Sequence, residues 1–566
     1  MTDSQPDSAA TAGSLRPRLV NPVALAELTA SLAPGKPGAS ITLADPASAS
    51  LATAVTGASL NSRTIRPGDL YLALPGARTH GAHFTAQAIG DGAAAVLTDQ
   101  AGAELIKAQE QAGQLSSPLP PLLIAEDPRG IAGYVAARIY QRNPLSLVGI
   151  TGTNGKTTVS YLVRSLFAAL GRDSGLIGTV ETLIGQNRVP SALTTPESPD
   201  LHALLARMSE ESLQAAVMEV SSHALTFGRV DGVLFDTAGF TNLSQDHLDL
   251  HGDMDSYLEA KAALFTPERS RRGVVVIDQS WGRKLAAHAQ IPVLTLWTGQ
   301  GSGEAEEADP VASARSTEQA DWRVIEADRE GLGWRIKLRG QAGELSFRTS
   351  LPGRFNIANA ALAVLLVHNS GVSLDALQKV LDAREPFRID VPGRMQLIGA
   401  APIAIVDFAH NPEGLRQALE AVRPEQGRLI TVFGATGERD QGKRPIMGAL
   451  AVRGSDIVIV TDDDPHDEPA AQIRDQVMAG AQAERERMRA EGHEPERLED
   501  VAPRAAAIDR AVALARPQDT ILIAGRGHEV WQEVSGTNLP LDDREELRVA
   551  LTRHGFDALG QSGLES

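Results

Sequence analysis

The stretch that decides the fold is V-G-I-T-G-T-N-G-K-T-T-V, residues 148–159. The apolar run 145–150 predicts a buried strand, and residues 159–169 predict a helix. A strand that enters a helix through a glycine-rich turn is typical of a parallel α/β sheet with a phosphate-binding loop at its carboxyl edge. The stretch therefore predicts an α/β fold that carries a nucleotide site.

The turn contains the residue types that phosphate binding requires. Gly152 and Gly155 let successive backbone N–H groups curl around an oxyanion, and the N-terminus of the following helix adds partial positive charge. Lys156 can reach the terminal phosphates, and the hydroxyl of Thr157 can ligate Mg²⁺. Ile150 replaces the first glycine of the strict G-x-x-x-x-G-K-T pattern. We predict ATP binding, and a glycine turn without a ligand is the alternative.

Length and composition indicate a globular protein of several domains. The chain has 566 residues, which is too long for a single core. Of these residues, 42% are hydrophobic and 22% charged, a composition typical of globular proteins. It has no cysteine, which excludes disulfides, thiolate metal sites and cysteine nucleophiles. The net charge of −18 argues against nonspecific nucleic-acid binding. Residues 1–18 lack an apolar core and predict a disordered tail. The sequence has no apolar run long enough to span a membrane, and we expect a cytoplasmic protein. We also expect a monomer.

Three regions separate by their patterns, and each predicts an α/β domain. They are residues 19–140, residues 141–385 with a mainly parallel sheet, and residues 386–566 with a Rossmann-like alternation. Three smaller features stand out: a strand, turn and strand at 60–77, a polar, acidic mobile loop or hairpin insertion at 299–320, and a solvated helix or loop at 484–499.

Acids, histidines and one lysine follow the phosphate loop along the chain. Glu219 ends the strand-like run 215–220, where a carboxylate can ligate Mg²⁺, although a solvent-facing glutamate is the alternative. The segment F-T-N-L-S-Q-D-H-L-D-L-H-G gathers Asn242, Asp246, His247, Asp249 and His251, any of which could be structural. Lys261 lies alone in the apolar helix Y-L-E-A-K-A-A-L-F, where a surface lysine is the usual alternative.

Taken together and in this order, the motifs resemble the Mur ligase family, which forms amide bonds at the expense of ATP in peptidoglycan precursor synthesis. The resemblance covers roughly residues 55–535. The matching segments are G-T-N-G-K-T-T, E-V-S-S-H, T-N-L-S-Q-D-H-L-D-L-H-G, the lysine after it, F-N-I-A-N-A, P-G-R-M-Q, D-F-A-H-N-P and G-E-R-D-Q-G-K-R-P.

The resemblance implies a catalytic and nucleotide site. Catalytic roles fall on Lys156, Glu219, His247 and Lys261, the last as a carbamate formed with CO₂. Two Mg²⁺ ions would be held by Thr157 and Glu219 and by His247 and Lys261. ATP as co-substrate would contact Gly152, Thr153, Asn154, Gly155, Lys156, Thr157, Thr158, Asn359, Arg394 and Asp407. A substrate carboxylate would attack the γ-phosphate, and an amine would displace phosphate from the acyl phosphate.

Within the family, the chain looks like the members that add the third amino acid to UDP-N-acetylmuramoyl-L-alanyl-D-glutamate. The N-terminal domain would bind the UDP-linked substrate, and the C-terminal domain the amino acid. The residues matched to the UDP-linked substrate are Ser62, Arg63, Thr194, Thr195, Ser221 and Arg229. Those matched to the amino acid are Arg439, Asp463, Asp464, Pro465, His466, Gly525 and Glu529.

The sequence departs from this pattern at T-D-D-D-P-H-D-E, residues 461–468. Members that use meso-diaminopimelate have D-N-P-R, whose arginine grips the distal carboxylate. Here an acid replaces the Asn and His466 replaces the Arg, with Asp467 and Glu468 just beyond. We therefore predict an amino acid with a bare terminal ammonium, L-lysine, with L-ornithine and meso-diaminopimelate as alternatives. A neighbouring ligase of the superfamily and an inactive nucleotide-binding scaffold are the remaining alternatives. The G-R-G-H-E motif at 525–529 and the N-S-R segment at 61–63 argue against the first, and the presence of Lys156, Glu219, His247 and Lys261 argues against the second.

Overall fold

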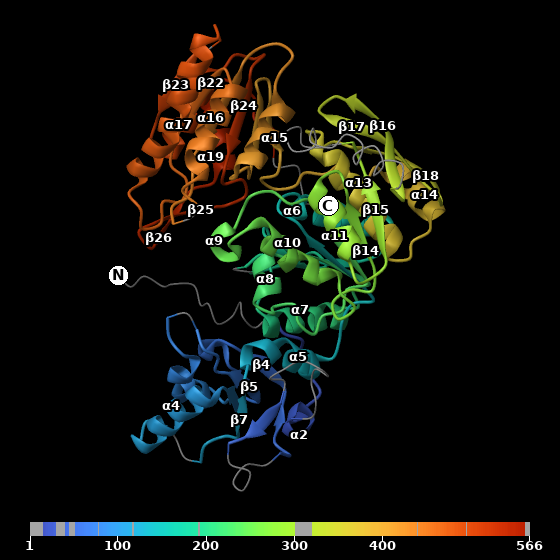
Figure 1. The fold of residues 1–566 in the computed structure, drawn as a ribbon, viewed down its shortest axis with the longest axis vertical. Helices are drawn as coiled ribbons and strands as arrows, with labels where there is room; N and C mark the ends of the chain where they lie inside the picture. The colour runs from blue at the N-terminus through green and yellow to red at the C-terminus, as the bar shows by residue number, and fades with distance from the viewer. Residues whose placement is uncertain are drawn as a thin grey trace.

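The computed structural model describes residues 15–29, 40–44, 51–76, 78–115, 118–190, 193–299, 320–438, 440–493 and 495–560. They form three α/β domains in sequence order, each built on its own main sheet and stacked along the long axis of the molecule (Figure 1). The predicted three-domain α/β fold is confirmed. No helix among these residues has the length and apolar composition needed to cross a bilayer.

The first domain contains a five-stranded sheet of order β2-β7-β6-β5-β4, in which β2 alone is antiparallel. Its elements are β1 (Val23–Ala24), α2 (Leu25–Thr29), β2 (Ile41–Leu43), β3 (Ala54–Val55), β4 (Gly57–Ser59), η1 (Ser62–Thr64), β5 (Asp69–Leu72), η2 (Gly81–Phe84), α3 (Thr85–Gly90), β6 (Ala95–Thr98), α4 (Gln100–Gln111), β7 (Leu122–Ala125) and α5 (Pro128–Tyr140).

Two predictions for this domain are wrong in part. Residues 60–66 are not a strand: β4 ends at Ser59, and the 3-10 helix η1 begins because the Asn61 side chain accepts a hydrogen bond from the Arg63 backbone N–H at 3.0 Å. Residues 15–18 are not part of a free tail, because the Arg16 guanidinium donates to the buried Asp69 carboxylate at 2.6 Å. Residues 1–14 lie outside the described residues.

The second domain is an eleven-stranded sheet of order β11-β10-β9-β12-β8-β13-β14-β15-β16-β17-β18, parallel from β9 to β16 with an antiparallel hairpin at each edge. Its elements are β8 (Ser146–Thr151), α6 (Lys156–Ala169), β9 (Ser174–Ile177), β10 (Thr182–Ile184), β11 (Asn187–Val189), α7 (Ser198–Glu210), β12 (Ala215–Glu219), α8 (Ser222–Thr226), β13 (Thr237–Phe240), α9 (Leu248–His251), α10 (Met254–Ala262), η3 (Ala263–Phe265), β14 (Gly273–Val276), α11 (Ser280–His288), β15 (Val293–Trp297), β16 (Trp322–Glu330), β17 (Gly333–Gly340), β18 (Gly343–Thr349), α13 (Phe355–Asn369) and α14 (Leu374–Arg384).

The core of this domain fixes the phosphate loop. Helix α6 packs on one side against strands β8, β9 and β12 and on the other against α13, whose residues 359–367 are all buried. Burying a helix on two sides removes most of its freedom to shift. The loop between β8 and α6 is therefore held at both ends. The predicted insertion 299–320 lies outside the described residues except at its two end residues.

The third domain is a six-stranded sheet of order β19-β20-β24-β21-β22-β23, parallel except for β19. Its elements are β19 (Gln396–Ala400), β20 (Ile403–Asp407), α15 (Pro412–Val422), β21 (Leu429–Phe433), α16 (Lys443–Gly454), β22 (Ile457–Val460), α17 (Ala470–Ala490), β23 (Arg497–Asp500), α18 (Arg504–Leu514), β24 (Thr520–Ala524), β25 (Trp531–Val534), β26 (Thr537–Pro540) and α19 (Asp543–Arg553).

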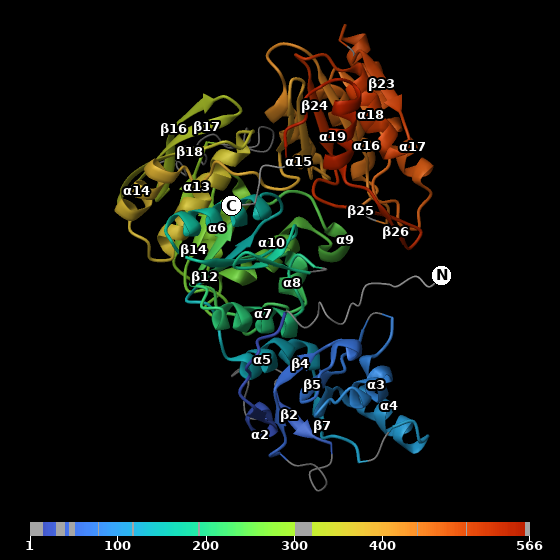
Figure 2. The ribbon, with the colours of Figure 1, turned by 180° about the vertical axis from the view of Figure 1, so that it is seen from behind.

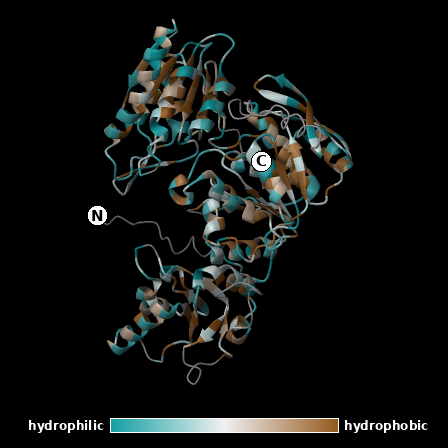
Figure 3. Ribbon diagram, in the orientation of Figure 1, coloured by the Kyte–Doolittle hydropathy of each residue, from teal (hydrophilic) through white to brown (hydrophobic). Residues whose placement is uncertain are grey.

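Figure 3 shows mostly hydrophobic residues in the central strands of this third domain and many hydrophilic residues in its outer helices. Figures 1 and 2 both place β25 and β26 at the end of the domain that faces the N-terminal domain. The predicted solvated segment 484–499 is wrong at Glu484, which is buried and accepts hydrogen bonds from Arg453 at 2.5 Å and Arg487 at 2.6 Å. Strand β23, at the end of the same segment, forms the edge of the sheet.

Candidate active site

The phosphate loop links β8 to α6 through two glycines with positive φ. Gly152 has φ of +141° and Gly155 has φ of +87°, and a Cβ at Gly152 would lie 1.9 Å from the Thr241 hydroxyl oxygen. The Lys156 ammonium folds back and donates to the carbonyls of Gly152 at 3.0 Å and Thr153 at 2.8 Å. Burial lowers the pKa of Lys156. The loop thus carries a partly desolvated cation beside open backbone geometry, which suits an anion.

Glu219 stands at the carboxyl end of β12, beside this loop, and is 1% exposed. Its carboxylate accepts hydrogen bonds from the Thr157 hydroxyl at 3.0 Å, the Thr179 backbone N–H at 2.9 Å and the Thr179 hydroxyl at 3.0 Å. The solvent-facing alternative for Glu219 is therefore wrong. A hydroxyl and a carboxylate oxygen in contact are the hard donors that Mg²⁺ prefers.

Lys261 is buried in helix α10, at 1% exposure, so the surface alternative for this lysine is wrong too. Its ammonium donates to the Gly152 carbonyl at 2.9 Å and lies 4.4 Å from the centre of the Tyr257 ring. Burial, with a further contribution from the nearby Lys156 charge, holds the pKa of Lys261 well below its ordinary value. A neutral amine is the form that this environment favours.

His247 lies in the loop between β13 and α9, with a left-handed φ of +53°. Its ring is 4.9 Å from that of His223 and 6.3 Å from that of Tyr257, centre to centre. Burial lowers the pKa of His247 to about 4, so the imidazole is neutral near pH 7 and can act as a ligand. Tyr257 therefore lies within contact range of both His247 and Lys261.

The C-terminal domain touches the phosphate loop directly. Arg394 donates to the Thr157 hydroxyl at 3.3 Å and stacks on Phe408 with its guanidinium carbon 4.0 Å from the ring centre. Asp407 accepts a hydrogen bond from the Met395 backbone N–H at 2.7 Å, which orients the segment next to Arg394. Burial lowers the pKa of Arg394 and raises that of Asp407. The C-terminal domain is thus in contact with the phosphate loop through Arg394.

Asn359, another predicted nucleotide contact, is buried beside Gly155. A Cβ at Gly155 would lie 2.5 Å from its Oδ1 atom, and its amide donates to Asn356 at 2.8 Å. A pocket opens here beside the phosphate loop; its lining includes Asn154, Gly155, Asp278, Phe355, Asn359 and Gln417. Thr153 and Thr158, also predicted, are buried in the loop and in α6.

A second interdomain contact was not predicted. The Asn411 amide donates to Asn154 at 3.2 Å and to the Asp246 carboxylate at 3.5 Å, and His410 lies 3.8 Å from Asp246. Although burial acts to raise it, hydrogen bonding and charge from His410 and His247 hold the pKa of Asp246 well below its usual range. The D-F-A-H-N-P segment at 407–412 was part of the resemblance, so this contact could have been sought there.

The residues predicted for the UDP-linked substrate fall into two groups. Thr195 links Glu219 to Ser221, donating to the Glu219 carbonyl at 2.8 Å and accepting from the Ser221 backbone N–H at 3.2 Å. The Thr194 hydroxyl lies 3.1 Å from the Thr179 hydroxyl, which itself donates to the Glu219 carboxylate. Arg229 pairs with Glu197 at 2.9 Å, a partner that was not predicted.

Ser62 and Arg63 form the second group, on η1 of the N-terminal domain. Ser62 is buried and donates to Gln87 at 3.0 Å. Thr194, Thr195, Ser221 and Arg229 thus belong to the central domain, while Ser62 and Arg63 lie on η1 of the N-terminal domain.

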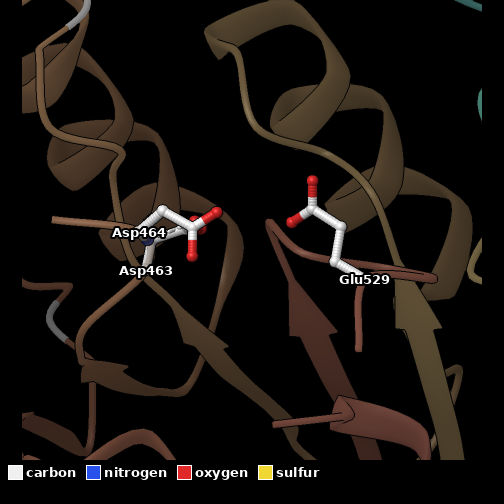
Figure 4. Close-up of side chains that lie close together, drawn as sticks. All are labelled: Asp463, Asp464 and Glu529. Atoms are coloured by element: carbon white, nitrogen blue, oxygen red, sulfur yellow. Dashed lines mark hydrogen bonds between the residues drawn. The ribbon is translucent and has the colours of Figure 1, made fainter. Parts of the chain in front are cut away.

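Three carboxylates converge at the carboxyl ends of β22 and β24 in the C-terminal domain. Asp463, Asp464 and Glu529 lie close together, with Asp463 and Asp464 facing Glu529 (Figure 4). The fully buried Arg526 guanidinium bonds to Asp464 and lies 3.8 Å from Glu529. Burial, reinforced by the charge of Asp463, raises the pKa of Glu529 to about 8 and also raises that of Asp464. One guanidinium does not neutralise three carboxylates.

Asp463 has one oxygen, Oδ2, that is buried without a hydrogen-bond partner among the described residues. Gly525, with φ of +118°, leaves room for it, since a Cβ there would lie 2.5 Å from the same oxygen. A buried, unpaired carboxylate oxygen is costly, and a bound donor would remove that cost.

Comparison with known proteins agrees with this geometry. Residues 54–119 match the Mur ligase family catalytic domain, residues 150–367 the Mur ligase middle domain, and residues 393–527 the Mur ligase glutamate ligase domain. The UDP-N-acetylmuramoyl-L-alanyl-D-glutamate--2,6-diaminopimelate ligase of Streptomyces coelicolor is 41% identical over 96% of this chain and 99% of its own length. The chain belongs to the Mur ligase family. It is an ATP-dependent ligase that forms a peptide bond.

Two more relatives extend this comparison. The UDP-N-acetylmuramyl-tripeptide synthetase of Leifsonia xyli is 42% identical, covering 89% of this chain and 92% of its own length. A solved UDP-N-acetylmuramoyl-L-alanyl-D-glutamate--2,6-diaminopimelate ligase is 28% identical with a TM-score of 0.60, covering 95% of this chain and 100% of its own. The Mur ligase thus matches tripeptide synthetases over nearly its whole length.

Around its acidic cluster, the Mur ligase differs from the sequence prediction in two ways. Glu468 is not a free extra carboxylate, because the buried Arg444 binds it bidentately, with two contacts of 2.9 Å. His466 turns to Glu533, with Nδ1 lying 2.9 Å from that carboxylate, and does not face the cluster alone. Asp467 is exposed and Pro465 is buried in the loop; Arg439 lies outside the described residues.

The support beneath this cluster was not predicted. Arg504 and Asp543, both fully buried, form two hydrogen bonds of 2.7 Å, and Arg504 also donates to the carbonyls of Asp462 at 3.0 Å and Ala524 at 2.9 Å. This pair ties the end of β24 to the loop after β22. Neither residue lies in a motif of the family, so no local sequence signal pointed to them.

Proposed function

We propose that this Mur ligase adds the third amino acid to UDP-N-acetylmuramoyl-L-alanyl-D-glutamate, converting ATP to ADP and phosphate, in peptidoglycan synthesis in the cytoplasm. The observation that carries the proposal is the Arg394–Thr157 contact at 3.3 Å. It joins the phosphate loop of one domain to the domain that holds the acidic cluster. The names of the relatives, which describe this ligation, support the same reaction.

The three domains would divide the substrates among them. We assign the UDP-linked substrate to residues 19–140, with Ser62 and Arg63, and to the group Thr194, Thr195, Ser221 and Arg229. Residues 141–385 would bind ATP through the phosphate loop 152–158 and Asn359, completed by Arg394 and Asp407. Residues 386–566 would bind the amino acid. A monomer is sufficient for this division, since each group comes from one chain.

The donor sets fit Mg²⁺. Thr157 and Glu219 offer a hydroxyl and a carboxylate oxygen already in contact, at 3.0 Å. His247 would hold a second ion together with Lys261 once that lysine is a carbamate. The lowered pKa of Lys261 supports this, because CO₂ adds to a neutral amine, which loses a proton as the carbamate forms. Bound Mg²⁺ would neutralise phosphate charge and bring two anions together.

The side chains of the chain then have distinct tasks. Lys156 leaves the loop carbonyls to which it donates and pairs with the γ-phosphate, which the substrate carboxylate attacks to form an acyl phosphate and ADP. Arg394 keeps the C-terminal domain against Thr157 while the amine attacks the acyl carbon and phosphate leaves. Closure of the two domains around the substrates would exclude water, which would otherwise hydrolyse the acyl phosphate.

For the amino acid we propose L-lysine. Burial first, and the charge of Asp463 second, raise the pKa of Glu529. Asp463, Asp464 and Glu529 together outnumber the Arg526 guanidinium, which leaves an excess of negative charge. A terminal ammonium would relieve it and could donate to the unpaired Oδ2 of Asp463. Gly525 provides the space; Pro465 and His466 would border the side chain, and Arg439 would bind a carboxylate.

meso-Diaminopimelate is the second candidate because the names of several relatives specify it, and L-ornithine differs from lysine by one methylene. The test is phosphate release from ATP with UDP-N-acetylmuramoyl-L-alanyl-D-glutamate, followed by competition of the three amino acids in one reaction. We expect release only when an amino acid is present, with the lysine tripeptide as the main product. Release without an amino acid, or none with any of the three, would exclude the ligase proposal, whereas a diaminopimelate product would exclude lysine alone.

A further inference from the structure

The hairpin β25–β26 closes over the loop that carries the acidic cluster. The Gln532 amide donates to the Asp463 carbonyl at 2.5 Å, and the Glu533 backbone N–H donates to the Asp464 carboxylate at 3.1 Å. In the other direction, the His466 backbone N–H donates to the Glu533 carbonyl at 3.2 Å. The hairpin and the loop are therefore paired like neighbouring strands, with Glu533 at the centre of the contact.

The side chains repeat this pairing. The Glu533 carboxylate lies 2.9 Å from Nδ1 of His466, the residue that stands where diaminopimelate enzymes have their carboxylate-binding arginine. His466 has a left-handed φ of +50°, and the Ser535 backbone N–H donates to its carbonyl at 2.9 Å, so both sides of the residue are fixed. Its imidazole is thus committed to a protein carboxylate.

We propose that Glu533 is a specificity-determining residue that excludes amino acids with a second carboxylate. The inference rests on the amino-acid pocket of the proposed function, and Glu533 lies outside the segments that carry the family resemblance. A distal carboxylate entering beside His466 would need a cation. Arg526 is bonded to Asp464 and His466 to Glu533, while Glu533 itself repels the newcomer.

The same arrangement tolerates a terminal ammonium. Such a group carries no charge that Glu533 would repel, and it faces three carboxylates. Discrimination by Glu533 therefore acts through repulsion of the wrong substrate rather than attraction of the right one. This kind of discrimination is lost when the repelling charge is removed, even if the pocket keeps its shape.

The experiment is a competition of L-lysine and meso-diaminopimelate for Glu533→Gln in the full-length enzyme with ATP and UDP-N-acetylmuramoyl-L-alanyl-D-glutamate. We expect the product ratio to move towards diaminopimelate by about three- to fivefold, the range of a partly exposed ion pair. Glu533→Asp, which keeps the charge, should move it less. Glu491→Gln, a matched change on an exposed residue that pairs with Arg487, should leave the ratio unchanged.

A double variant tests whether Glu533 acts through His466. Adding His466→Ala should make the effects of the two changes non-additive on the ratio. An unchanged ratio in Glu533→Gln, or an equal loss of rate with both amino acids, would overturn the inference, the latter by showing a merely structural role. Failure of the proposed function would appear separately, as a wild-type enzyme that makes only the diaminopimelate product or none.

Discussion

The phosphate loop of the central domain and the acidic cluster of the C-terminal domain are electrostatic opposites. Around the loop, burial lowers the pKa values of Lys156, Lys261 and Arg394. Around the cluster, burial raises the pKa values of Asp464 and Glu529. Each region holds like charges out of water, and each is relieved by a ligand of opposite sign. The comparison indicates which substrate end belongs where: phosphates at the loop and an ammonium at the cluster.

The largest expected effect tests the phosphate-loop side of this comparison, by removing its buried lysine, Lys261. Lys261→Ala should lower the ligation rate by roughly 10³-fold, because a group that stabilises developing charge in a desolvated site is lost. Its thermal unfolding should not fall to lower temperature, since the wild-type amine is buried at a cost. Added acetate or formate should restore part of the rate by replacing the carbamate.

The matched control for that variant is Lys284→Ala. Lys284 is an exposed helix lysine that pairs with Asp255, outside the site. Its substitution should leave the phosphate-release rate unchanged. A normal rate in Lys261→Ala would remove this lysine from the mechanism. Failure of every small carboxylate to rescue the variant, while Lys284→Ala stays fully active, would contradict the carbamate.

Glu219 is a buried carboxylate beside the phosphate loop, at 1% exposure. Glu219→Gln keeps its shape but removes the charge, so we expect the apparent affinity for Mg²⁺ to fall at least about tenfold. A titration of ligation rate against Mg²⁺ at saturating ATP measures it. An unchanged half-saturation point would mean that Glu219 only orders Thr157 and Thr179, to which it is hydrogen-bonded.

Making the acidic cluster less negative should change which amino acid the enzyme prefers. Asp464→Asn combined with His466→Arg removes one carboxylate and adds a guanidinium, which should shift the preference towards diaminopimelate by roughly tenfold, the value of one charge-assisted hydrogen bond. The product ratio in a mixed reaction reports this shift. Should the ratio stay at its wild-type value, the loop 463–466 does not read the distal end of the amino acid.

The smallest expected effect is a pH dependence that belongs to the cluster alone. Glu529 has its pKa raised to about 8, so it gains charge as pH rises through that value, and binding of an ammonium should improve: KM for lysine should fall a few-fold between about pH 7 and 9. The same shift makes Glu529 lower the folding stability progressively as pH rises from about 4.5 to about 8 without ligand.

Glu529→Gln should remove both trends. The KM of this variant for lysine should be higher and nearly flat over the same pH range, and its stability should fall less with pH. Fluorescence-monitored thermal unfolding and initial rates measure the two. If the variant kept the wild-type slope in KM, the titrating group would be another one, and the electrostatic contrast between the two regions would rest on Asp464 alone.

Local patterns predicted the fold well because they depend on neighbours in sequence. The strand-to-helix turn at the phosphate loop and the parallel strands ending at Glu219 and Asp407 are where periodicity predicts them. Residue patterns failed where a partner lies far along the chain. The sequence predicts a solvated Glu484 and a free Glu468. In the structure Arg453 donates a hydrogen bond to Glu484, and Arg444, 24 residues away in sequence, binds Glu468. Ion pairs of this kind leave no periodic signal.

Lys261 shows the same limit within the site itself. The sequence of its helix is typical of a helix with a surface lysine. Only the resemblance to the Mur ligase family assigned a role to Lys261. Burial came from the packing of α10 against the phosphate loop, which brings Lys261 to the Gly152 carbonyl across 109 residues. The neutral amine that a carbamate requires is therefore a product of tertiary packing.

By itself, the sequence determined the three α/β domains, the nucleotide loop and the family, because glycine turns, apolar periodicity and motif order are properties of the chain. Only the tertiary structure decided which charges are free. It paired Arg526 with Asp464 and His466 with Glu533 while leaving Asp463 Oδ2 without a partner among the described residues. Charge balance in a pocket is a sum over side chains that meet only after folding, and local spacing carries no information about that sum.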